Sequence, residues 1–122
     1  MKRMQFRKMI MEIIIKAYAN LTFDEIAKEL DEALVQVSTE KGWPTPNSYR
    51  EWSDEELSIV LADAPTKRNA VRYARAFGRG FGSVMQIYQW AATKTKEIKR
   101  KRGDDKFVNQ IKRVSKLVGW YV

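Results

Sequence analysis

The chain contains neither cysteine nor histidine, and these two absences exclude much of the usual chemistry of protein sites. Without cysteine there is no disulfide, thiolate metal site or cysteine nucleophile, and without histidine there is no imidazole ligand and the commonest general base is missing. Metal or acid–base chemistry would have to depend on carboxylates alone. We therefore expect a protein that is not an enzyme, uses no cofactor, binds no metal and has no small-molecule substrate.

A long apolar run is also missing. No stretch approaches the roughly 18 apolar residues of a membrane span. Arg7, Lys8 and Glu12 interrupt the apolar residues near the start, so that no clean signal-peptide core forms. The sequence therefore predicts a cytoplasmic protein with no membrane partner. Its 122 residues, 44% of them hydrophobic, are enough for one moderate core or two small ones.

Acidic residues are scarce in one part of the chain. Between Thr66 and Arg102, eleven Lys and Arg stand against the single acid Glu97, a balance of +10 in a chain whose net charge is +8. Residues 1–65 carry eight Lys and Arg against twelve Asp and Glu, a balance of −4. So concentrated a positive charge predicts a polyanionic partner. Nucleic acid is favoured over a membrane surface because the basic residues flank a Gly-Arg turn and not a long apolar face.

Helical spacing predicts an all-α protein. Residues 4–18 place apolar side chains on one side of a first helix, which we expect to be buried. These side chains are Phe6, Met9, Ile10, Ile13 and Ala17, and Ile14 and Ile15 widen the face. Two capping boxes, Thr22 with Glu25 and Ser53 with Glu56, predict the starts of the next two helices. The second helix runs to about Leu34, burying Ile26, Leu30 and Ala33, and the third ends before Pro65.

Further breaks define the second half of the chain. Thr66 is expected to cap a fourth helix that reaches Phe77, with Gly78 in a left-handed conformation at its end. A fifth helix is expected to start at Ser83 and to continue through Thr93 into the basic run. Residues 103–105 then break and recap the chain before a last helix, whose apolar stripe is Phe107, Ile111, Val114 and Val118 and which Gly119 stops.

The loop at residues 42–47 (Gly-Trp-Pro-Thr-Pro-Asn) is the expected boundary between domains. We expect it to be rigid and to form one short strand pair at most. We expect an N-terminal helical region at 1–47, a DNA-binding unit with its basic extension at 48–102, and a C-terminal helix packed on that unit at 103–122. The N-terminal region is acidic overall and is interpreted as a packing or self-association surface. The alternative is a second DNA contact through Lys2, Arg3, Arg7 and Lys8.

Residues 52–92 resemble the Myb/SANT-like helix-turn-helix repeats. Residues 52–57 (Trp-Ser-Asp-Glu-Glu-Leu) are similar to the opening of such a repeat. Tyr73 and Ala74, residues 77–79 (Phe-Gly-Arg) and residues 82–84 (Gly-Ser-Val) are similar to its second helix, turn and third helix.

Trp52 and Tyr88 take places where the family has core tryptophans, while something smaller near Val71 replaces the middle one. That departure suits a divergent bacterial or phage version. The resemblance implies that the third helix reads DNA.

The residues of that helix agree with this reading. If Val84, Ile87, Tyr88 and Ala91 face the core, other side chains point outward, and glutamine can pair with an adenine edge in the major groove. The expected base-facing residues are Ser83, Met85, Gln86, Gln89 and Thr93. The expected phosphate contacts are Lys67, Arg68, Arg79, Lys94, Lys96, Lys99, Arg100, Lys101 and Arg102.

Each motif also has a simpler structural explanation. The aromatic residues are better explained as core than as base-stacking groups, and the run from Lys99 to Arg102 could be a solvated helix end favoured by the helix dipole. The glycines at 78, 80 and 82 follow a helix and are spaced too closely for a dinucleotide fingerprint. The acids at 54–56 and 104–105 lie at helix starts, where capping explains them.

The sequence thus predicts a non-catalytic protein that binds double-stranded DNA, either as an architectural, nucleoid-associated protein that coats or bridges DNA or as a transcriptional regulator. The alternative is a helical interaction module whose basic face binds an acidic partner protein.

Overall fold

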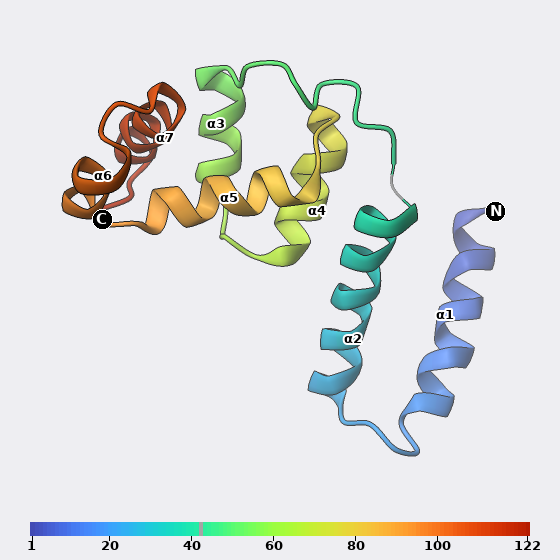
Figure 1. Ribbon diagram of the computed structural model, residues 1–122. Helices are drawn as coiled ribbons and strands as arrows, with labels where there is room; N and C mark the ends of the chain where they lie inside the picture. Colours follow the sequence, from blue (N-terminus) through green and yellow to red (C-terminus); the bar gives the residue numbers. More distant parts are fainter. Residues whose placement is uncertain (42) are drawn as a thin grey trace. The chain divides into compact units, whose positions relative to one another are not determined.

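The computed structural model describes residues 1–41 and 43–122, and these residues form helices and connecting turns without a strand (Figure 1). The all-α prediction is therefore confirmed. The chain divides into two compact units, which we call unit 1 (Met1–Leu34) and unit 2 (Val35–Val122). Gly42, the first residue of the expected boundary loop, lies outside the described residues.

Unit 1 is a helical hairpin of α1 (Arg3–Ala17) and most of α2 (Phe23–Gln36), whose last two residues belong to unit 2. The Thr22 capping box is confirmed: the Glu25 amide donates to Thr22 Oγ1 (3.2 Å), and the Thr22 amide donates to Glu25 Oε1 (3.0 Å). The expectation of a buried first helix is wrong, because no residue of α1 is buried. In α2, Ile26 is buried, whereas Leu30 and Ala33 are exposed. Apolar periodicity identifies the face of a helix that favours burial, but it does not show whether another element packs on that face.

A π-helical turn, Val37–Lys41, follows α2 directly before the loop expected at residues 42–47. Unit 2 then contains α3 (Asp54–Leu61), α4 (Lys67–Phe77), α5 (Phe81–Ala92), α6 (Thr95–Arg102) and α7 (Lys106–Leu117).

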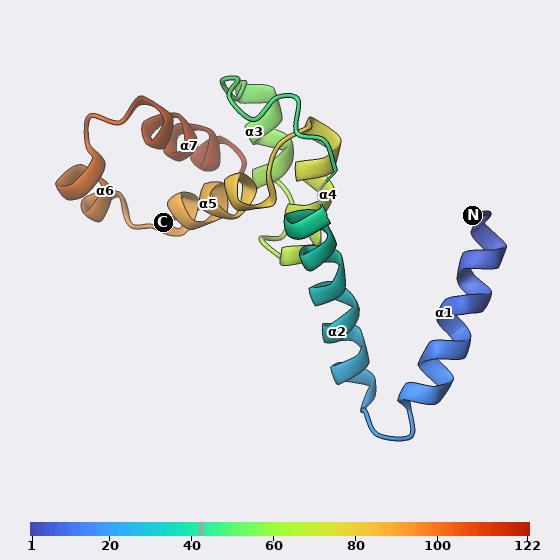
Figure 2. The ribbon, with the colours of Figure 1, turned by 45° about the vertical axis from the view of Figure 1, so that its right-hand side comes forward.

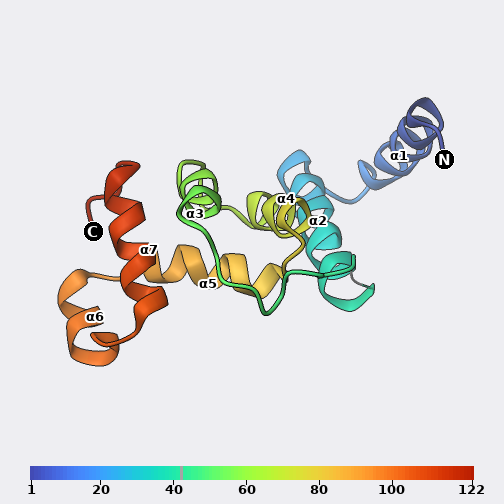
Figure 3. The same cartoon turned by 90° about the horizontal axis from the view of Figure 1, so that it is seen from above.

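The core of unit 2 lies between α3, α4, α5 and α7. Leu57, Val60 and Leu61 of α3 and Ile111 and Val114 of α7 are buried in it. The four residues of α5 expected to face the core, Val84, Ile87, Tyr88 and Ala91, are all buried there. Figure 3 shows α7 beside α3, with α5 crossing both, so that the last helix covers the side of the core that α4 leaves open.

Local capping chemistry fixes most helix ends as expected. Ser53 and Glu56 form the second capping box, and Thr66 Oγ1 accepts from the Asn69 amide (3.1 Å). Gly78 ends α4 with φ 65°, in the left-handed region, and Asp105 Oδ1 caps α7.

Two boundaries differ from expectation. Helix α5 begins at Phe81 with Gly80 as its N-cap, two residues before Ser83. It ends at Ala92 because Thr93 is extended (ψ 134°), and the basic run therefore forms a helix of its own, α6.

Candidate nucleic-acid interface

Helix α5 carries a row of exposed polar side chains opposite its buried face. Ser83, Gln86 and Gln89 are exposed and follow one another at intervals of three residues, so that they lie along one side of the helix. Their expected orientation is confirmed. Side chains of this kind donate and accept hydrogen bonds, and a glutamine presents both groups in the geometry that matches an adenine edge.

Two other residues expected in this row are placed differently. Met85 is half-buried and packs against the core, because α5 is covered by α3, α4 and α7 and its apolar face is wider than the sequence suggested. Thr93 is half-buried, and its hydroxyl donates to Gln89 O (2.7 Å) at the end of the helix. Of the five residues expected to face bases, three are therefore exposed on α5.

A shallow groove lies beside the first half of the row. Its volume is about 600 Å³, and residues 48–52, Ser83 and Gln86, and Lys106, Phe107 and Gln110 line it. Residues 48–52 and the start of α7 therefore flank the N-terminal end of α5. Gln89 does not line this groove and stays exposed beyond it.

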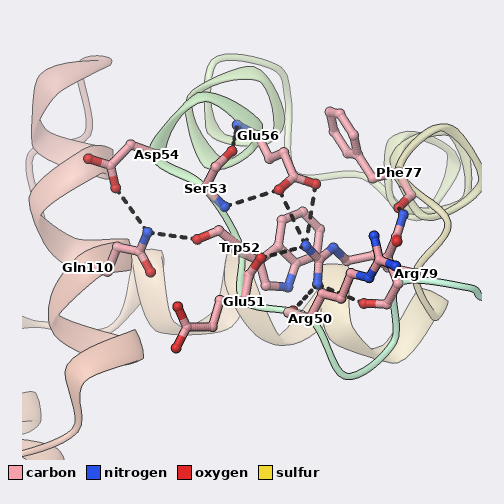
Figure 4. A network of polar contacts seen from close by, with 10 residues as sticks. Arg50, Glu51, Trp52, Ser53, Asp54, Glu56, Phe77, Arg79 and Gln110 are labelled. Carbon is pink, nitrogen blue, oxygen red and sulfur yellow. Dashed lines mark hydrogen bonds and ion pairs between the residues drawn. The ribbon is translucent and has the colours of Figure 1, made fainter.

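Arg79 was expected to contact phosphate, and the structure corrects this. Only 4% of the residue is exposed, and its guanidinium points inward and lies over the Trp52 ring (Figure 4). Nη1 donates to Asn47 O (3.0 Å) and to Arg50 O, while Nη2 donates to Glu51 O (2.9 Å) and lies 3.3 Å from Glu56 Oε1. A guanidinium so occupied by protein oxygens is unavailable to DNA. It fixes residues 47–51 to the turn between α4 and α5.

Asn47 covers the same turn from outside. Its side-chain amide donates to Phe77 O (2.8 Å) and its backbone amide to Gly78 O (2.9 Å), which satisfies carbonyls at the end of α4. A Cβ on Gly78 would lie 3.0 Å from both Asn47 Nδ2 and Pro46 Cγ. The Gly-Arg turn is thus covered by the preceding segment and does not project from unit 2.

Helix α7 is joined to the start of α3 by polar contacts that sequence reasoning did not identify. Arg113 forms two bonds of 2.9 Å with the Asp54 carboxylate, and Gln110 Nε2 donates to Asp54 Oδ1 (2.9 Å) and Trp52 O (3.0 Å) (Figure 4). The Arg113 and Gln110 hydrogen bonds hold the pKa of Asp54 below its ordinary value. Asp54 was interpreted only as a residue of a helix start, because contacts between residues nearly sixty positions apart leave no local pattern.

Lys112 is a second residue that the sequence analysis missed. It is buried, and its ammonium donates to Ala91 O (3.0 Å), Thr93 O (2.8 Å) and Val122 O (2.9 Å). A cation here satisfies carbonyls at the C-terminal end of α5, where the helix dipole favours positive charge. Burial, and then the neighbouring Lys116 charge, lower the pKa of Lys112. No local pattern marked it for burial, because Lys112 lies about 100° or more around the helix from each residue of the apolar stripe of α7.

The other expected phosphate contacts are exposed. Lys67 and Arg68 lie in the first turn of α4, and Lys94 is the N-cap of α6. Helix α6 presents Lys96, Lys99, Arg100, Lys101 and Arg102, and is anchored by the buried Ile98.

Two of these cations have an acidic neighbour on the same helix. Arg100 pairs with Glu97 at 2.8 Å, and Lys101 lies 3.9 Å from the same carboxylate. Both pairs are exposed and therefore weak, so they leave the cations available. Arg102 lies 5.9 Å from the ring of Trp90 on α5, which places the end of the basic helix near α5.

Two features are absent from the described residues. No group of three or more acidic residues there is arranged to hold a metal ion. No helix of that part of the chain is both long and apolar enough to cross a bilayer.

Comparison with known proteins identifies relatives of this chain. The family described as "Uncharacterised protein PM1205 C-terminal domain" matches residues 46–122, which contain all five helices of unit 2. The chain belongs to this family. It is also 34% identical over 119 residues to the "Uncharacterized protein PM1205" of Pasteurella multocida (strain Pm70), covering 95% of each chain. No solved structure matches it significantly.

Proposed function

We propose that unit 2 binds double-stranded DNA without catalysing a reaction on it. Helices α3, α4 and α5 serve as a Myb-like helix-turn-helix unit, and α5 enters the major groove with Ser83, Gln86 and Gln89 toward the bases. Helix α6 and the start of α4 contact the flanking phosphates. The family match and the relative carry no functional description, so this proposal stands on the residues alone.

The division of charge between the units supports unit 2 as the binding part. Unit 2 contains seventeen Lys and Arg against nine Asp and Glu, a balance of +8, whereas unit 1 contains six of each and balances to zero. The whole excess of positive charge therefore belongs to unit 2. A phosphate backbone supplies most of the attraction in sequence-independent binding, and such a unit meets that requirement.

The observation that carries the proposal is the position of α6 after α5. The exposed polar row of α5 is followed, after only Thr93 and Lys94, by a helix whose exposed residues are almost all cationic. Residues that can read bases and residues that can hold phosphates thus succeed one another on two adjoining helices. The exposed row of α5 contains only three side chains, a short serine and two uncharged glutamines. So few side chains can read only a few bases directly. We therefore propose sequence-tolerant, architectural binding, with regulation at a defined site as the other form of the same function.

The central experiment is a mobility-shift titration of the full chain on random and A·T-rich duplexes at several salt concentrations. If five to seven phosphates are contacted, log K should fall with log salt at a slope of about −5 to −6. Replacing both Lys96 and Lys99 by alanine should make this slope shallower by about 2. Lys28→Ala, on α2 of unit 1, is a control that removes an exposed positive charge and should leave the slope unchanged. Binding that does not respond to salt would overturn the proposal.

Base contact is tested separately. Gln86→Ala and Gln89→Ala should reduce any preference for A·T-rich duplexes while leaving the melting temperature nearly unchanged, because exposed helix substitutions usually stay within about 0.5 kcal/mol. The two variants also test two different parts of the surface, because Gln86 lines the groove and Gln89 does not. If neither affects the preference, α5 does not read bases and the affinity belongs to the cations alone.

The groove supports a second candidate function, the binding of an acidic partner protein. Two cations, Arg50 and Lys106, line it against the single acid Glu51, and Tyr49 and Phe107 add apolar surface, a combination that suits an acidic segment with one apolar side chain. Competition distinguishes the two functions. An acidic peptide that binds more tightly than duplex DNA at equal salt, and loses affinity on Lys106→Glu, would favour the protein partner.

A further inference from the structure

Unit 1 exposes many large apolar side chains on both of its helices. On α1, Phe6 is 57% exposed, Ile13 59% and Ile15 68%, and Met4, Met9 and Met11 are exposed as well. These residues form two stripes. Because residues two positions apart point about 200° from each other on a helix, Met11 and Ile13 lie on nearly opposite sides. One stripe is Phe6, Met9 and Ile13, and the other is Met4, Met11 and Ile15.

The second of these stripes borders a shallow, largely apolar groove. The groove has a volume of about 240 Å³, and Met4, Met11 and Ile15 line it together with Arg7, Lys8 and Glu12. We call this surface the α1 groove face. Two cations, Arg7 and Lys8, stand on either side of its apolar residues, since they lie about 300° and 40° around the helix from Met4.

Helix α2 carries the matching pattern with the opposite charge. Phe23, Leu30 and Leu34 are exposed and lie on one side of α2 within unit 1, at spacings of seven and four residues. We call this row, from Phe23 to Leu34, the α2 stripe. Acidic residues flank it: Asp24 on one side and Glu29 on the other. In total α2 contains five acids against Lys28, whereas α1 contains four bases against Glu12.

We propose that unit 1 is a dimerisation element in which the α1 groove face of one copy packs along the α2 stripe of a second copy. Two copies then bury two such contacts around a two-fold axis. Each contact places apolar residues at heptad-like spacing against one another, with Arg7 and Lys8 facing Asp24 and Glu29 across the edges.

The charges of α1 and α2 favour a second copy of this chain over other partners for these surfaces. Pairing α1 with a second α1 would bring like cations together, and pairing α2 with α2 would do the same for carboxylates. An anionic membrane would attract α1 but repel the five acids of α2. In both views of the hairpin, α1 and α2 diverge from the turn at residues 18–22, so the two arms stand apart over most of their length (Figures 1 and 2). A second copy is the partner that offers both required surfaces at once.

The inference is independent of DNA binding but has a consequence for it. A dimer presents two copies of unit 2 and can hold two duplexes or two segments of one duplex, which raises the overall affinity without a new contact. Failure of unit 2 to bind DNA would leave the dimer unaffected, and the oligomeric state is measured without DNA.

The experiment uses sedimentation equilibrium on the full chain and two charge-reversed variants. Variant A carries Arg7→Glu and Lys8→Glu, and variant B carries Asp24→Lys and Glu29→Lys. The unaltered chain should sediment as a dimer. Each variant alone should dimerise roughly tenfold or more weakly, because like charges then face each other across both contacts.

The decisive measurement is an equimolar mixture of A and B. In a mixed dimer, the acidic α1 of A meets the basic α2 of B, and the basic α1 of B meets the acidic α2 of A, so dimerisation should return. Contacts within one chain cannot produce this rescue, because each variant keeps its own like-charged helices. A monomeric unaltered chain, or a mixture that stays monomeric while circular dichroism shows both variants helical, would overturn the proposal.

Discussion

The guanidinium carbon of Arg79 lies 4.1 Å from the centre of the Trp52 ring, between the turn that joins α4 to α5 and the segment that leads into α3. The same guanidinium donates hydrogen bonds to the backbone oxygens of Asn47, Arg50 and Glu51. One buried cation therefore holds these two segments of unit 2 together.

Replacement of Arg79 should destabilise unit 2 and not merely weaken DNA binding. Arg79→Ala leaves buried carbonyl oxygens without donors and should cost about 3 kcal/mol or more of the free energy of unfolding. Arg79→Lys should also be destabilising, because one ammonium cannot reproduce the fork of the guanidinium. Arg72→Ala is the control, since Arg72 is exposed and its pair with Asp63 is 3.8 Å long. Denaturant unfolding that gives equal stability for Arg79→Ala and Arg72→Ala would contradict the buried placement.

Alanine at two glycines should change stability in opposite directions. Gly78→Ala forces a side chain into the left-handed region (φ 65°) and against Pro46 and Asn47, and should cost roughly 1–3 kcal/mol. At Gly82, inside α5, an added Cβ would meet nothing within 4 Å. Gly82→Ala should therefore stabilise by up to about 1 kcal/mol through helix propensity. Urea midpoints of the two variants test the pair, and a stabilising Gly78→Ala would be inconsistent with the turn described.

The hydroxyl of Tyr88 should be dispensable although its ring is not. The ring is buried, and the hydroxyl has no hydrogen-bond partner among the described residues, while burial raises the pKa of Tyr88 to about 12. Tyr88→Phe should leave the melting temperature unchanged or raise it slightly, because a desolvated, unpaired group is removed. Tyr88→Ala should cost roughly 3–5 kcal/mol through the cavity it leaves. A strongly destabilising Tyr88→Phe would reveal a partner for the hydroxyl.

The contact between Asp54 and Arg113 should appear as pH-dependent stability at acid pH. The pKa of Asp54 is lower in the folded chain than its ordinary value of 3.8, mainly because Arg113 hydrogen-bonds the carboxylate. A carboxylate with a depressed pKa contributes stability that is fully present above its unfolded pKa and is lost as pH falls through the folded pKa. The unaltered chain should therefore exceed Asp54→Asn in stability near neutral pH, and the difference should shrink below about pH 4.

A double-mutant cycle supplies the control for this prediction. In an Arg113→Ala background, Asp54→Asn should lose most of its pH-dependent effect, because the main partner is gone. Thermal melts between neutral pH and acid pH measure all four proteins. An effect of Asp54→Asn that persists without Arg113 would assign the stabilisation to the start of the α3 helix instead.

The sequence by itself determined the helices and most of their ends. Ser53, Thr66 and Asp105 each bond an amide three residues away, and Gly78 is the residue that tolerates a left-handed helix end. Such interactions depend only on neighbours in the chain, so a local pattern is sufficient to predict them. The same holds for the buried face of α5, since a regular helix fixes which of its residues share a side. The charge division, too, can be counted from the sequence.

Only the tertiary structure decided what those faces and charges meet. Arg79 looks like any exposed turn arginine in the sequence, and its burial depends on carbonyls 28 to 32 residues earlier in the chain. Lys112 is buried because α7 places it beside the end of α5, and Asp54 acquires Arg113 because α7 lies beside α3. For α1 the opposite occurred: an apolar face that the sequence marked for burial remains exposed in the single chain. Apolar periodicity indicates which surface of a helix favours burial. Whether that surface is buried, and which element buries it, depends on how distant parts of the chain pack.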